Sequence, residues 1–336
     1  MPLRVVITRR LPTIAQQLLQ ARGIAYACLE ELGLLSHVGI VEQSTGAAAL
    51  LTTLRERVDR RVLDAAGESL RVVSNCAVGF DNIDVVECAR RGIYVTNTPG
   101  VLTNATADLT WALILAVGRR VVEGDSLVRS GGWTGWEPLQ LCGLEFDGAT
   151  LGIIGAGRIG SAVARRAGGF GMRILYVARG VRPELESACA AQRVSLDRVL
   201  DEADVVTIHL PLTDETRHLI SEAQLVRMKP TAILVNTARG PIVDEEALVR
   251  ALRSGQIAGA GLDVYEDEPR LSSGLADAPG VVLLPHLGSA SVRTRERMAR
   301  MAAENVISVL EGRMPPNPVN KPALGRTSRD RAEPRP

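Results

Sequence analysis

Lysine and aromatic residues are scarce in this chain. Lys229 and Lys321 are the only lysines among 39 basic residues, so arginine carries nearly all of the positive charge. The 38 acidic residues leave a formal net charge of +1, and this balance creates no long-range field that would attract nucleic acid or an anionic membrane. Phenylalanine, tryptophan and tyrosine make up 3% of the residues, and no basic block is interleaved with them, so no nucleic-acid-binding pattern is present.

Long apolar runs and cysteine pairs are lacking as well. The longest apolar run, residues 109–117, has about half of the ~20 residues that a membrane-spanning helix needs. Residues 5–7 are apolar but too few for the core of a signal peptide. The five cysteines form no C-x-x-C pair and have no histidine at metal-binding spacing, so we expect reduced thiols and no metal site. These features favour a cytoplasmic protein that is not attached to a membrane.

The length of 336 residues exceeds what one hydrophobic core usually holds, so two domains are expected. Short apolar stretches alternate with helical ones, the pattern of an α/β fold whose parallel sheets are covered on both faces. The predicted strands are residues 3–8, 70–74, 93–95, 151–154, 173–177, 205–209, 232–236, 258–262 and 281–284. The predicted helices are residues 14–22, 84–91, 103–130, 159–168 and 289–310. Gly124 is the position inside the long helix that we regard as doubtful, and Gly131-Gly132 is expected to end it.

A glycine-rich turn follows the strand predicted at residues 151–154. It reads Gly155-Ala156-Gly157-Arg158-Ile159-Gly160. The first glycine permits a tight turn, the second lets the backbone approach a pyrophosphate, and the third lets the helix pack closely on the strand. The amides at the N-terminus of the helix would bind the phosphates. An ordinary glycine-rich turn is the alternative, but the strand before it, the helix after it and the later strands favour a Rossmann-like dinucleotide-binding domain.

The end of the next strand discriminates between the two nicotinamide dinucleotides. An NAD enzyme usually has an acidic residue there, which holds both ribose hydroxyls. This chain has Ala178 at that place, followed by Arg179, Gly180 and, further on, Arg182. Because no carboxylate repels a 2′-phosphate and guanidinium groups can bind it, we expect NADPH to be preferred, with NADH as the alternative cofactor. The competing interpretation is that both arginines are solvated loop residues.

Polar side chains follow three further predicted strands, at the edge where ligands of parallel sheets bind. Arg239 lies in residues 236–240, Glu268 in residues 262–269 and His286 in residues 285–289. Taken singly, each has a structural explanation: a surface arginine, an acid in a turn before proline, and a histidine that caps a helix. Their occurrence together at the rim of one cofactor site favours a catalytic set.

Three further runs make the sequence similar to a known family. They are residues 78–84 (VGFDNID), residues 91–103 (RGIYVTNTPGVLT) and residues 131–134 (GGWT). With the motifs above, they resemble the D-isomer-specific 2-hydroxyacid dehydrogenases over about residues 3–320, and most closely the glyoxylate/hydroxypyruvate reductase branch. Members of this family carry a catalytic arginine, glutamate and histidine, and the resemblance places these roles on Arg239, Glu268 and His286.

The chemistry of reducing a keto acid agrees with these roles. His286 can give a proton to the carbonyl oxygen, and Glu268 beside it would stabilise the imidazolium and orient the ring. Arg239 offers a planar fork for the substrate carboxylate. The resemblance further implies that the amides of Val78 and Gly79 contact the substrate carboxylate, that Asp263 holds the nicotinamide carboxamide, and that Thr106, Pro211, Thr237, Ala238 and Gly288 contact the cofactor elsewhere.

The substrate-binding domain of this family is discontinuous, and this implies the domain boundaries. We expect residues 1–101 and 289–322 to form it, with a Rossmann cofactor domain at residues 102–288 inserted and residues 323–336 as a disordered tail. Both domains would be Rossmann-like or flavodoxin-like with parallel sheets. The active site would lie in the cleft between them and would close by hinge motion near Gly100 and Gly288.

The branch implies glyoxylate and hydroxypyruvate as substrates, reduced to glycolate and D-glycerate, and a homodimer. In that branch a tryptophan at the position of Trp136 enters the substrate pocket of the partner, whereas we expect Trp133 to pack against its own domain. Another 2-keto acid as substrate stays open, as does a corepressor that senses dinucleotide and keeps the catalytic set.

Three features speak against other members of the family. Val78 stands where phosphite dehydrogenases have a lysine, and the chain has no length for the regulatory domains of phosphoglycerate dehydrogenases. Ala178 replaces the ribose-binding acid that D-lactate enzymes usually keep.

Overall fold

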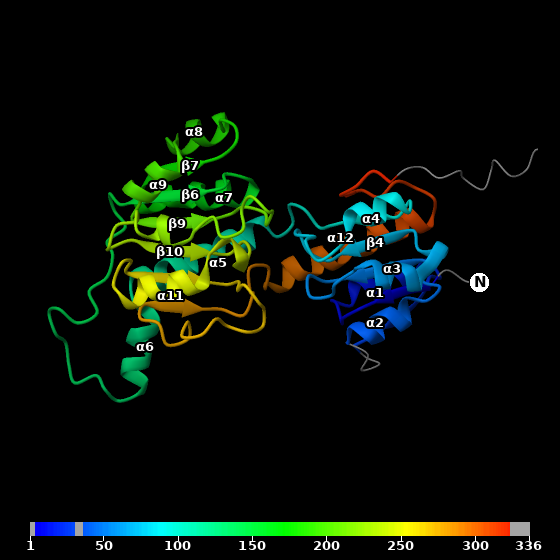
Figure 1. Ribbon diagram of the computed structural model, residues 1–336, viewed down its shortest axis with the longest axis horizontal. Coiled ribbons are helices and arrows are strands. Elements are labelled where there is room, and N and C mark those ends of the chain that lie inside the picture. Colours follow the sequence, from blue (N-terminus) through cyan, green and yellow to red (C-terminus); the bar gives the residue numbers. More distant parts are fainter. Residues whose placement is uncertain (1–3, 31–35, 323–336) are drawn as a thin grey trace, which may run out of the picture. The chain divides into compact units, whose positions relative to one another are not determined.

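The computed structural model describes residues 4–30 and 36–322. The predicted tail at residues 323–336 lies outside this range. The chain divides into two compact units, unit 1 (Met1–Leu102 and Ala290–Pro336) and unit 2 (Thr103–Ser289) (Figure 1). Both have parallel sheets and helices, which confirms the predicted fold class. No helix in the described ranges combines the length and the apolar character that crossing a membrane requires.

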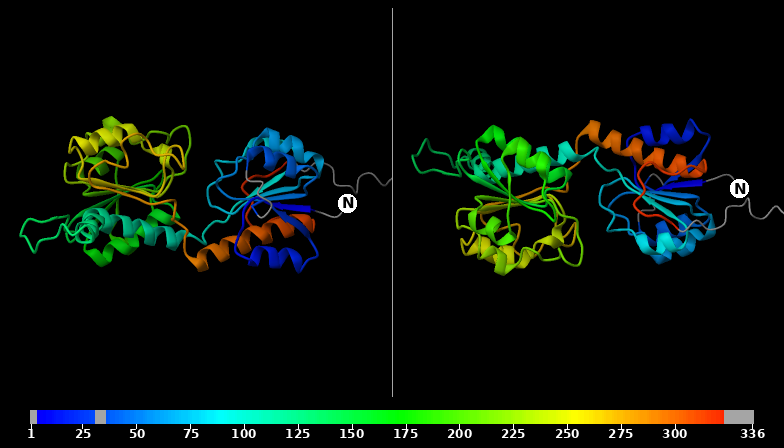
Figure 2. Two further views of the ribbon diagram at one scale, coloured as in Figure 1. Left: turned by 90° about the horizontal axis from the view of Figure 1, so that it is seen from below. Right: turned by 90° about the horizontal axis from the view of Figure 1, so that it is seen from above.

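Unit 1 is built on a five-stranded parallel sheet with the order β2-β1-β3-β4-β5. Its strands are β1 (Arg4–Ile7), β2 (Ala25–Cys28), β3 (Ala49–Thr52), β4 (Val72–Asn75) and β5 (Tyr94–Thr96). Its helices are α1 (Ile14–Gln20), α2 (His37–Ser44), α3 (Arg60–Ala66), the 3-10 helix η1 (Gly67–Ser69), α4 (Val85–Arg90) and α12 (Val292–Leu310). Helices α1 and α12 lie on one face of the sheet, and α2, α3 and α4 cover the other (Figure 2).

Unit 2 has a seven-stranded parallel sheet with the order β12-β11-β10-β9-β6-β7-β8. Its strands are β6 (Thr150–Ile154), β7 (Arg173–Val177), β8 (Gln192–Arg193), β9 (Val205–Ile208), β10 (Ile233–Asn236), β11 (Gly259–Leu262) and β12 (Val281–Leu283). Its helices are α5 (Thr103–Gly118), α6 (Val121–Arg129), α7 (Arg158–Ala167), α8 (Pro183–Cys189), α9 (Leu196–Glu202), α10 (Glu222–Leu225) and α11 (Glu245–Arg253), with the 3-10 helices η2 (Gly168–Phe170) and η3 (Gly240–Ile242).

The core of unit 2 consists of two layers, one on each face of the sheet. Helices α5 and α7 cover one face, where Trp111 and Val163 are buried and the ring of Trp111 stacks on Phe170 with centroids 4.4 Å apart. Helices α9 and α11 cover the other, where Val199 and Leu248 are fully buried. Because both faces are covered, β6, β9 and β10 are buried at every position and mostly apolar, as the sequence pattern predicts.

All predicted strands are present, and their bounds differ from the predicted ones by at most two residues where they are described. The predicted helices at residues 14–22, 84–91, 159–168 and 289–310 correspond to α1, α4, α7 and α12. The sequence analysis did not identify β2, β3 and β8, nor the helices α2, α3, α8, α9, α10 and α11.

The prediction of one helix over residues 103–130 is wrong, because α5 and α6 are separate. Arg120 precedes α6 with φ 52° and ψ 39°, a left-handed conformation that interrupts the helix. The chain returns across the end of α5, where the Leu144 amide donates to the Gly118 carbonyl over 2.7 Å. Gly124, the expected weak point, lies inside α6, and Gly131 follows that helix with φ 73°, as predicted.

The close crossing over α5 predicts a strict requirement for glycine at position 143. A Cβ on Gly143 would lie 2.2 Å from the Gly118 carbonyl oxygen, a backbone atom that cannot move aside. We expect Gly143→Ala to lower the free energy of unfolding by about 2 kcal/mol, and the melting temperature by about 5 °C. Gly168→Ala is the control, because Gly168 has φ −58° and nothing within 4 Å of a Cβ. Equal melting temperatures of the two variants would contradict the crossing.

Candidate active site

The glycine-rich turn connects β6 to α7 at the carboxyl edge of the unit 2 sheet. Gly155 has φ 102°, and a Cβ there would lie 2.7 Å from the His209 carbonyl oxygen. A Cβ on Gly160 would lie 2.2 Å from the Gly155 carbonyl oxygen, whereas one on Gly157 would meet nothing within 4 Å. The turn is therefore tightly packed at its first and third glycines and open at its second. This is the shape that lets a pyrophosphate approach the backbone, and no side chain caps the N-terminus of α7.

Three arginines surround the end of β7, next to this turn. Arg182 donates from Nε to the Ala156 carbonyl over 2.9 Å, and Arg179 is exposed. Arg193 donates from Nε to the Ala178 carbonyl over 2.9 Å and from Nη2 to the Arg179 carbonyl over 3.2 Å. The sequence analysis missed Arg193, because it comes from the two-residue strand β8, whose pairing with β7 has no local signal.

Asp263, directly after β11, binds the backbone of the segment that follows β12. Its side chain is fully buried and accepts from the amides of Leu287 and Gly288 over 2.6 and 2.7 Å. Burial raises the pKa of Asp263, while the two amides and the nearby His286 oppose this rise. A Cβ on Gly288 would lie 3.3 Å from Asp263 Oδ2 and 3.6 Å from Thr106 Oγ1, so these three predicted cofactor residues lie together.

The remaining predicted cofactor residues of unit 2 lie on neighbouring segments of the carboxyl edge. Thr237 Oγ1 is 2.9 Å from Thr110 Oγ1, and Thr110 also donates to the carbonyl of Thr106 over 2.8 Å. Ala238 donates its amide to Asn236 Oδ1 over 3.0 Å, directly after β10. Pro211 follows β9 and accepts at its carbonyl from Thr216 Oγ1 over 2.8 Å.

His286 and Glu268 form a hydrogen-bonded pair. Nδ1 of His286 lies 2.9 Å from Oε2 and 3.1 Å from Oε1 of Glu268. Because an ionised carboxylate can only accept, Nδ1 carries the hydrogen of this bond, and Nε2 takes no part in it. Burial would raise the pKa of Glu268, but the hydrogen bond and the charge of His286, the Tyr265 amide and the Arg239 guanidinium together lower it from its usual 4.5. The carboxylate is therefore ionised at neutral pH.

Tyr265 sets the backbone on which His286 sits, a role that the sequence analysis missed. His286 has φ 56°, which is unusual for a residue with a side chain. The Leu284 carbonyl accepts from the His286 amide over 3.1 Å and from the Tyr265 hydroxyl over 2.8 Å. Tyr265 also donates its amide to Glu268 Oε1 over 3.2 Å, so one buried tyrosine links both members of the pair.

Arg239 follows β10 on a loop that Asn236 holds. The Asn236 side chain is buried and donates from Nδ2 to the Arg239 carbonyl over 2.9 Å. The guanidinium of Arg239 donates from Nη1 to the Ala238 carbonyl over 2.8 Å, and its charge contributes to the lowered pKa of Glu268. The structure thus brings all three predicted catalytic residues to one edge of the unit 2 sheet.

A second histidine–glutamate pair lies in the same unit, and the sequence analysis did not predict it. His218 Nε2 is 2.9 Å from Glu266 Oε2, and Glu266 Oε1 accepts from the Glu245 amide over 2.8 Å. The Glu266 amide in turn donates to the buried carboxylate of Glu245 over 2.8 Å. Glu266 is thus bound on both sides and ties the loop before Glu268 to α11. In the described part of the chain no group of three or more His, Cys, Asp or Glu side chains could hold a metal ion.

Comparisons with known proteins agree with this arrangement. A family model described as D-isomer specific 2-hydroxyacid dehydrogenase, NAD binding domain, matches residues 111–288. A glyoxylate reductase of Aeropyrum pernix is 56% identical over 288 residues, 84% of this chain and 85% of that relative. A glyoxylate reductase of Thermococcus onnurineus is 49% identical over 325 residues, 96% of this chain and 97% of that relative. A solved NADPH-dependent glyoxylate/hydroxypyruvate reductase of Sinorhizobium meliloti, in complex with NADP and malonate, has a TM-score of 0.85 at 32% identity and covers 97% of this chain and 100% of its own.

The chain belongs to the D-isomer-specific 2-hydroxyacid dehydrogenase family. The predicted family is thereby confirmed. This dehydrogenase uses a nicotinamide dinucleotide, and most of unit 2 is the NAD-binding domain of the family.

The other predicted substrate contacts of the dehydrogenase come from both units. Val78 and Gly79 follow β4 in unit 1, and their carbonyls accept from Asn97 and Asn75 over 2.7 and 2.8 Å. In unit 2, the side chain of Trp136 is 82% exposed and that of Trp133 is 52% exposed. The expectation that Trp133 packs against its own domain is therefore wrong, since over half of its surface is accessible.

The lowered pKa of Glu268 predicts a pH-dependent stability. A carboxylate whose pKa is lower in the folded than in the unfolded chain stabilises the fold at neutral pH, and this contribution is lost as the pH falls through the folded-state value. We therefore expect Glu268→Gln to be less stable than the parent in urea at pH 7, and the difference to narrow below the usual pKa of 4.5. Asp267→Asn is the control, since its carboxylate is 68% exposed and, within residues 4–30 and 36–322, forms its ion pair with Arg270 on the surface. If the difference in the free energy of unfolding between the parent and Glu268→Gln were the same from pH 7 to pH 4, the pKa of Glu268 would not be lowered by folding.

Proposed function

We propose that this dehydrogenase reduces glyoxylate and hydroxypyruvate, with NADPH as the preferred cofactor, to glycolate and D-glycerate. The observation that carries the proposal is the His286–Glu268 pair, with Nδ1 of His286 2.9 Å from Glu268 Oε2 and the charge of Arg239 acting on the same carboxylate. The names of its relatives, which are glyoxylate reductases at 49% and 56% identity, support the same substrate class.

The proposed roles follow from the chemistry of the three side chains. Hydride transfer is what the bound dinucleotide supplies. Nε2 of His286 gives a proton to the substrate carbonyl oxygen, while Glu268 stabilises the positive charge on the ring and fixes its orientation. The guanidinium of Arg239 binds the substrate carboxylate, since its planar donors fit two carboxylate oxygens. We assign cofactor binding to unit 2, and substrate contact through Val78 and Gly79 to unit 1.

Loss of the proton donor is the first test. His286→Asn should lower kcat/KM for glyoxylate with NADPH by about 10²-fold or more, as expected for a missing general acid. His218→Asn is the matched control, because it removes the other histidine–glutamate pair of unit 2, and it should keep most of the activity. If the two variants lost activity equally, His286 would not be the acid. A parent protein that bound dinucleotide but turned over neither keto acid would fit the corepressor-like alternative instead, and a preference for another 2-keto acid would correct the substrate.

The preference for NADPH rests on the residues at the end of β7. Ala178 has no carboxylate to repel a 2′-phosphate, and Arg179 and Arg182 are exposed beside it. Arg193 holds the carbonyls of Ala178 and Arg179, which adds a third guanidinium to the same place. The similarity to an NADPH-dependent reductase supports this preference.

The second test measures both reduced cofactors. We expect kcat/KM for NADPH to exceed that for NADH by at least about tenfold, ~1.4 kcal/mol. Arg179→Ala should remove most of this preference and leave the use of NADH nearly unchanged. Arg173→Ala is the control, since Arg173 begins the same strand at the opposite edge of the sheet and pairs with Glu202. Equal kcat/KM values for the two cofactors in the parent would refute the preference.

We also propose that the enzyme is a homodimer. Helix α6 and the loop after it project from the body of unit 2 (Figures 1 and 2). This arm carries exposed apolar side chains, which are Val121, Val122, Val128, Trp133, Trp136 and Leu139. An apolar surface of this kind is costly to leave in water and is typical of a subunit interface. We propose that a second copy of the chain packs against this surface, and that Trp136 enters the substrate pocket of that copy.

The third test addresses this arm. Trp136→Ala should relax the selection of hydroxypyruvate over bulkier keto acids and leave the affinity for NADPH unchanged, because the indole is proposed to limit the partner's pocket. Sedimentation should show a dimer at the concentration of the activity assay. A monomer with full activity at that concentration would disprove the shared pocket. Leu139→Ala on the same arm is the comparison, because it removes another exposed apolar side chain but keeps the indole, and it should leave the selection among keto acids as in the parent.

A further inference from the structure

The sheet of unit 1 has a crevice that the proposed reaction does not use. In the order β2-β1-β3-β4-β5, α1 leaves β1 toward one face and α3 leaves β3 toward the other. The connections therefore diverge at the carboxyl ends of β1 and β3, and ligands of open α/β sheets bind at such a switch point. The predicted substrate contacts Val78 and Gly79 follow β4 instead, on the next strand.

Arginines line a cavity of about 610 Å³ at this switch point. Arg9 follows β1, Arg55 and Arg57 follow β3, and Arg61 lies in the first turn of α3. Two carboxylates, those of Glu56 and Asp59, face the same cavity, so its formal charge is positive even with His37 neutral. Whether the cavity attracts an anion depends on how far these carboxylates neutralise the arginines.

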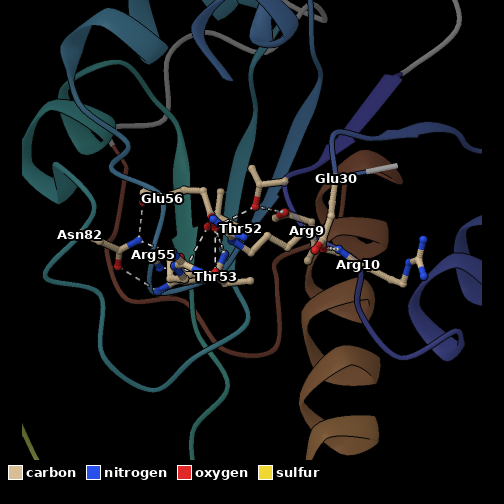
Figure 3. A network of polar contacts seen from close by, with 11 residues as sticks. Arg9, Arg10, Glu30, Thr52, Thr53, Arg55, Glu56 and Asn82 are labelled. Carbon is tan, nitrogen blue, oxygen red and sulfur yellow. Dashed lines mark hydrogen bonds and ion pairs between the residues drawn. The ribbon is translucent and has the colours of Figure 1, made fainter. Parts of the chain in front are cut away.

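Both oxygens of the Glu56 carboxylate accept hydrogen bonds from neighbouring side chains. Arg9 Nε lies 2.5 Å from Oε1, and Oε2 accepts from the hydroxyls of Thr8 and Thr53 over 2.9 and 2.8 Å (Figure 3). The side chain is 2% exposed. Burial would raise the pKa of Glu56, but the hydrogen bonds from Thr53, Arg9 and Thr8 together lower it. Glu56 therefore neutralises Arg9 and no other arginine of the cavity.

Asp59 is bound to the start of α3. Its Oδ1 accepts from the amides of Arg61 and Val62 over 3.1 and 3.3 Å. Its Oδ2 lies 3.3 Å from His37 Nε2 and 3.9 Å from Arg57 Nε, the second at the limit of an ion pair. In the described residues, the exposed guanidinium groups of Arg55 and Arg61 have no carboxylate partner at all. The cavity thus holds two unneutralised cations and one that is weakly neutralised.

A second cavity of unit 1 shows the opposite arrangement. It measures about 460 Å³ and is lined by Arg60, Arg90 and Arg91 among others. Arg91 pairs with Asp64 over 2.6 Å, and Arg90 and Arg91 each pair with Glu87 over 2.7 Å. Arg60 lies 3.8 Å from Asp64. Both cavities are lined by arginines, so arginines alone do not distinguish them. They differ because the arginines of the second cavity have carboxylates beside them, whereas Arg55 and Arg61 have none among the described residues.

We propose that the switch-point cavity of unit 1 binds a phosphoryl group, as inorganic phosphate, pyrophosphate or a phosphate monoester, separately from the cofactor. A phosphoryl group presents three oxygens and more than one negative charge, so Arg55, Arg61 and Arg57 can each donate to it. The proposal goes beyond keto-acid reduction and does not depend on it.

Titration of the full-length protein with sodium pyrophosphate tests the proposal. The measurement is isothermal titration calorimetry at low ionic strength, with saturating NADPH present so that the glycine-rich turn of unit 2 is occupied. We expect one pyrophosphate per chain, and an Arg55→Ala/Arg61→Ala double variant should bind at least about tenfold more weakly. Arg60→Ala is the matched control, because Arg60 precedes Arg61 in α3 but lines the other cavity. It should bind pyrophosphate as the parent does.

Competition experiments with other anions test whether the cavity selects a phosphoryl group. Inorganic phosphate should compete with pyrophosphate, whereas citrate should compete more weakly at equal concentration because its carboxylates do not reproduce the phosphoryl geometry. The absence of binding to the parent, unchanged binding by the double variant, or equal weakening in Arg60→Ala would each overturn the site. Citrate binding as tight as that of pyrophosphate would overturn the assignment to a phosphoryl group. Arg55 and Arg61 are exposed, so the melting temperature of the double variant should match that of the parent.

Discussion

Neighbouring parallel strands end at a common edge, and most of the candidate site residues of this dehydrogenase depend on that constraint. In unit 2 the residues after β6, β7, β10, β11 and β12 all emerge at the carboxyl edge of one sheet. The residues of the candidate site are distant in sequence, yet each lies within three positions of the end of one of these strands. They are Gly155, Arg179, Arg239, Asp263 and His286. In unit 1 the same rule brings the residues after β1, β3 and β4 together at the carboxyl edge of its own sheet.

Strand ends bring residues close, but hydrogen bonds to the backbone orient them. Asp263 binds two amides of the segment that carries His286, and Tyr265 holds the carbonyl two residues before it. Glu266 and Glu245 exchange amide and carboxylate hydrogen bonds, which tie the loop before Glu268 to α11. All of these contacts are made within unit 2, and they fix the orientation of the histidine and of the carboxylate beside it.

Local patterns in the sequence were sufficient for most of the fold and for the central residues of the site. Buried parallel strands are short and apolar, so β6, β7 and β9 were recognisable from a few residues each. The glycines at 155, 157 and 160 were recognised because turn chemistry is a property of neighbouring residues. The positions of Arg239, Glu268 and His286 after predicted strands made them candidates, and the resemblance to the family implied their catalytic roles. Strand β3 was missed because its Ala-Leu-Leu-Thr follows further alanines, and such a run fits a buried helix as well as a strand.

The features that remained hidden depend on contacts between distant segments. The break between α5 and α6 lies at the left-handed Arg120, where residues 143–146 cross the end of α5, and the apolar pattern of residues 103–130 does not reveal this long-range contact. Arg193 reaches Ala178 only because β8 pairs with β7, and Tyr265 reaches Leu284 only because β11 lies beside β12. The sequence by itself thus determined the class of fold, the cofactor turn and the catalytic residue types. The tertiary structure alone decided which carboxylates form ion pairs and which arginines of the described residues have no carboxylate nearby. An ion pair requires two side chains to be close in space, and the distance between residues in the sequence does not reveal that.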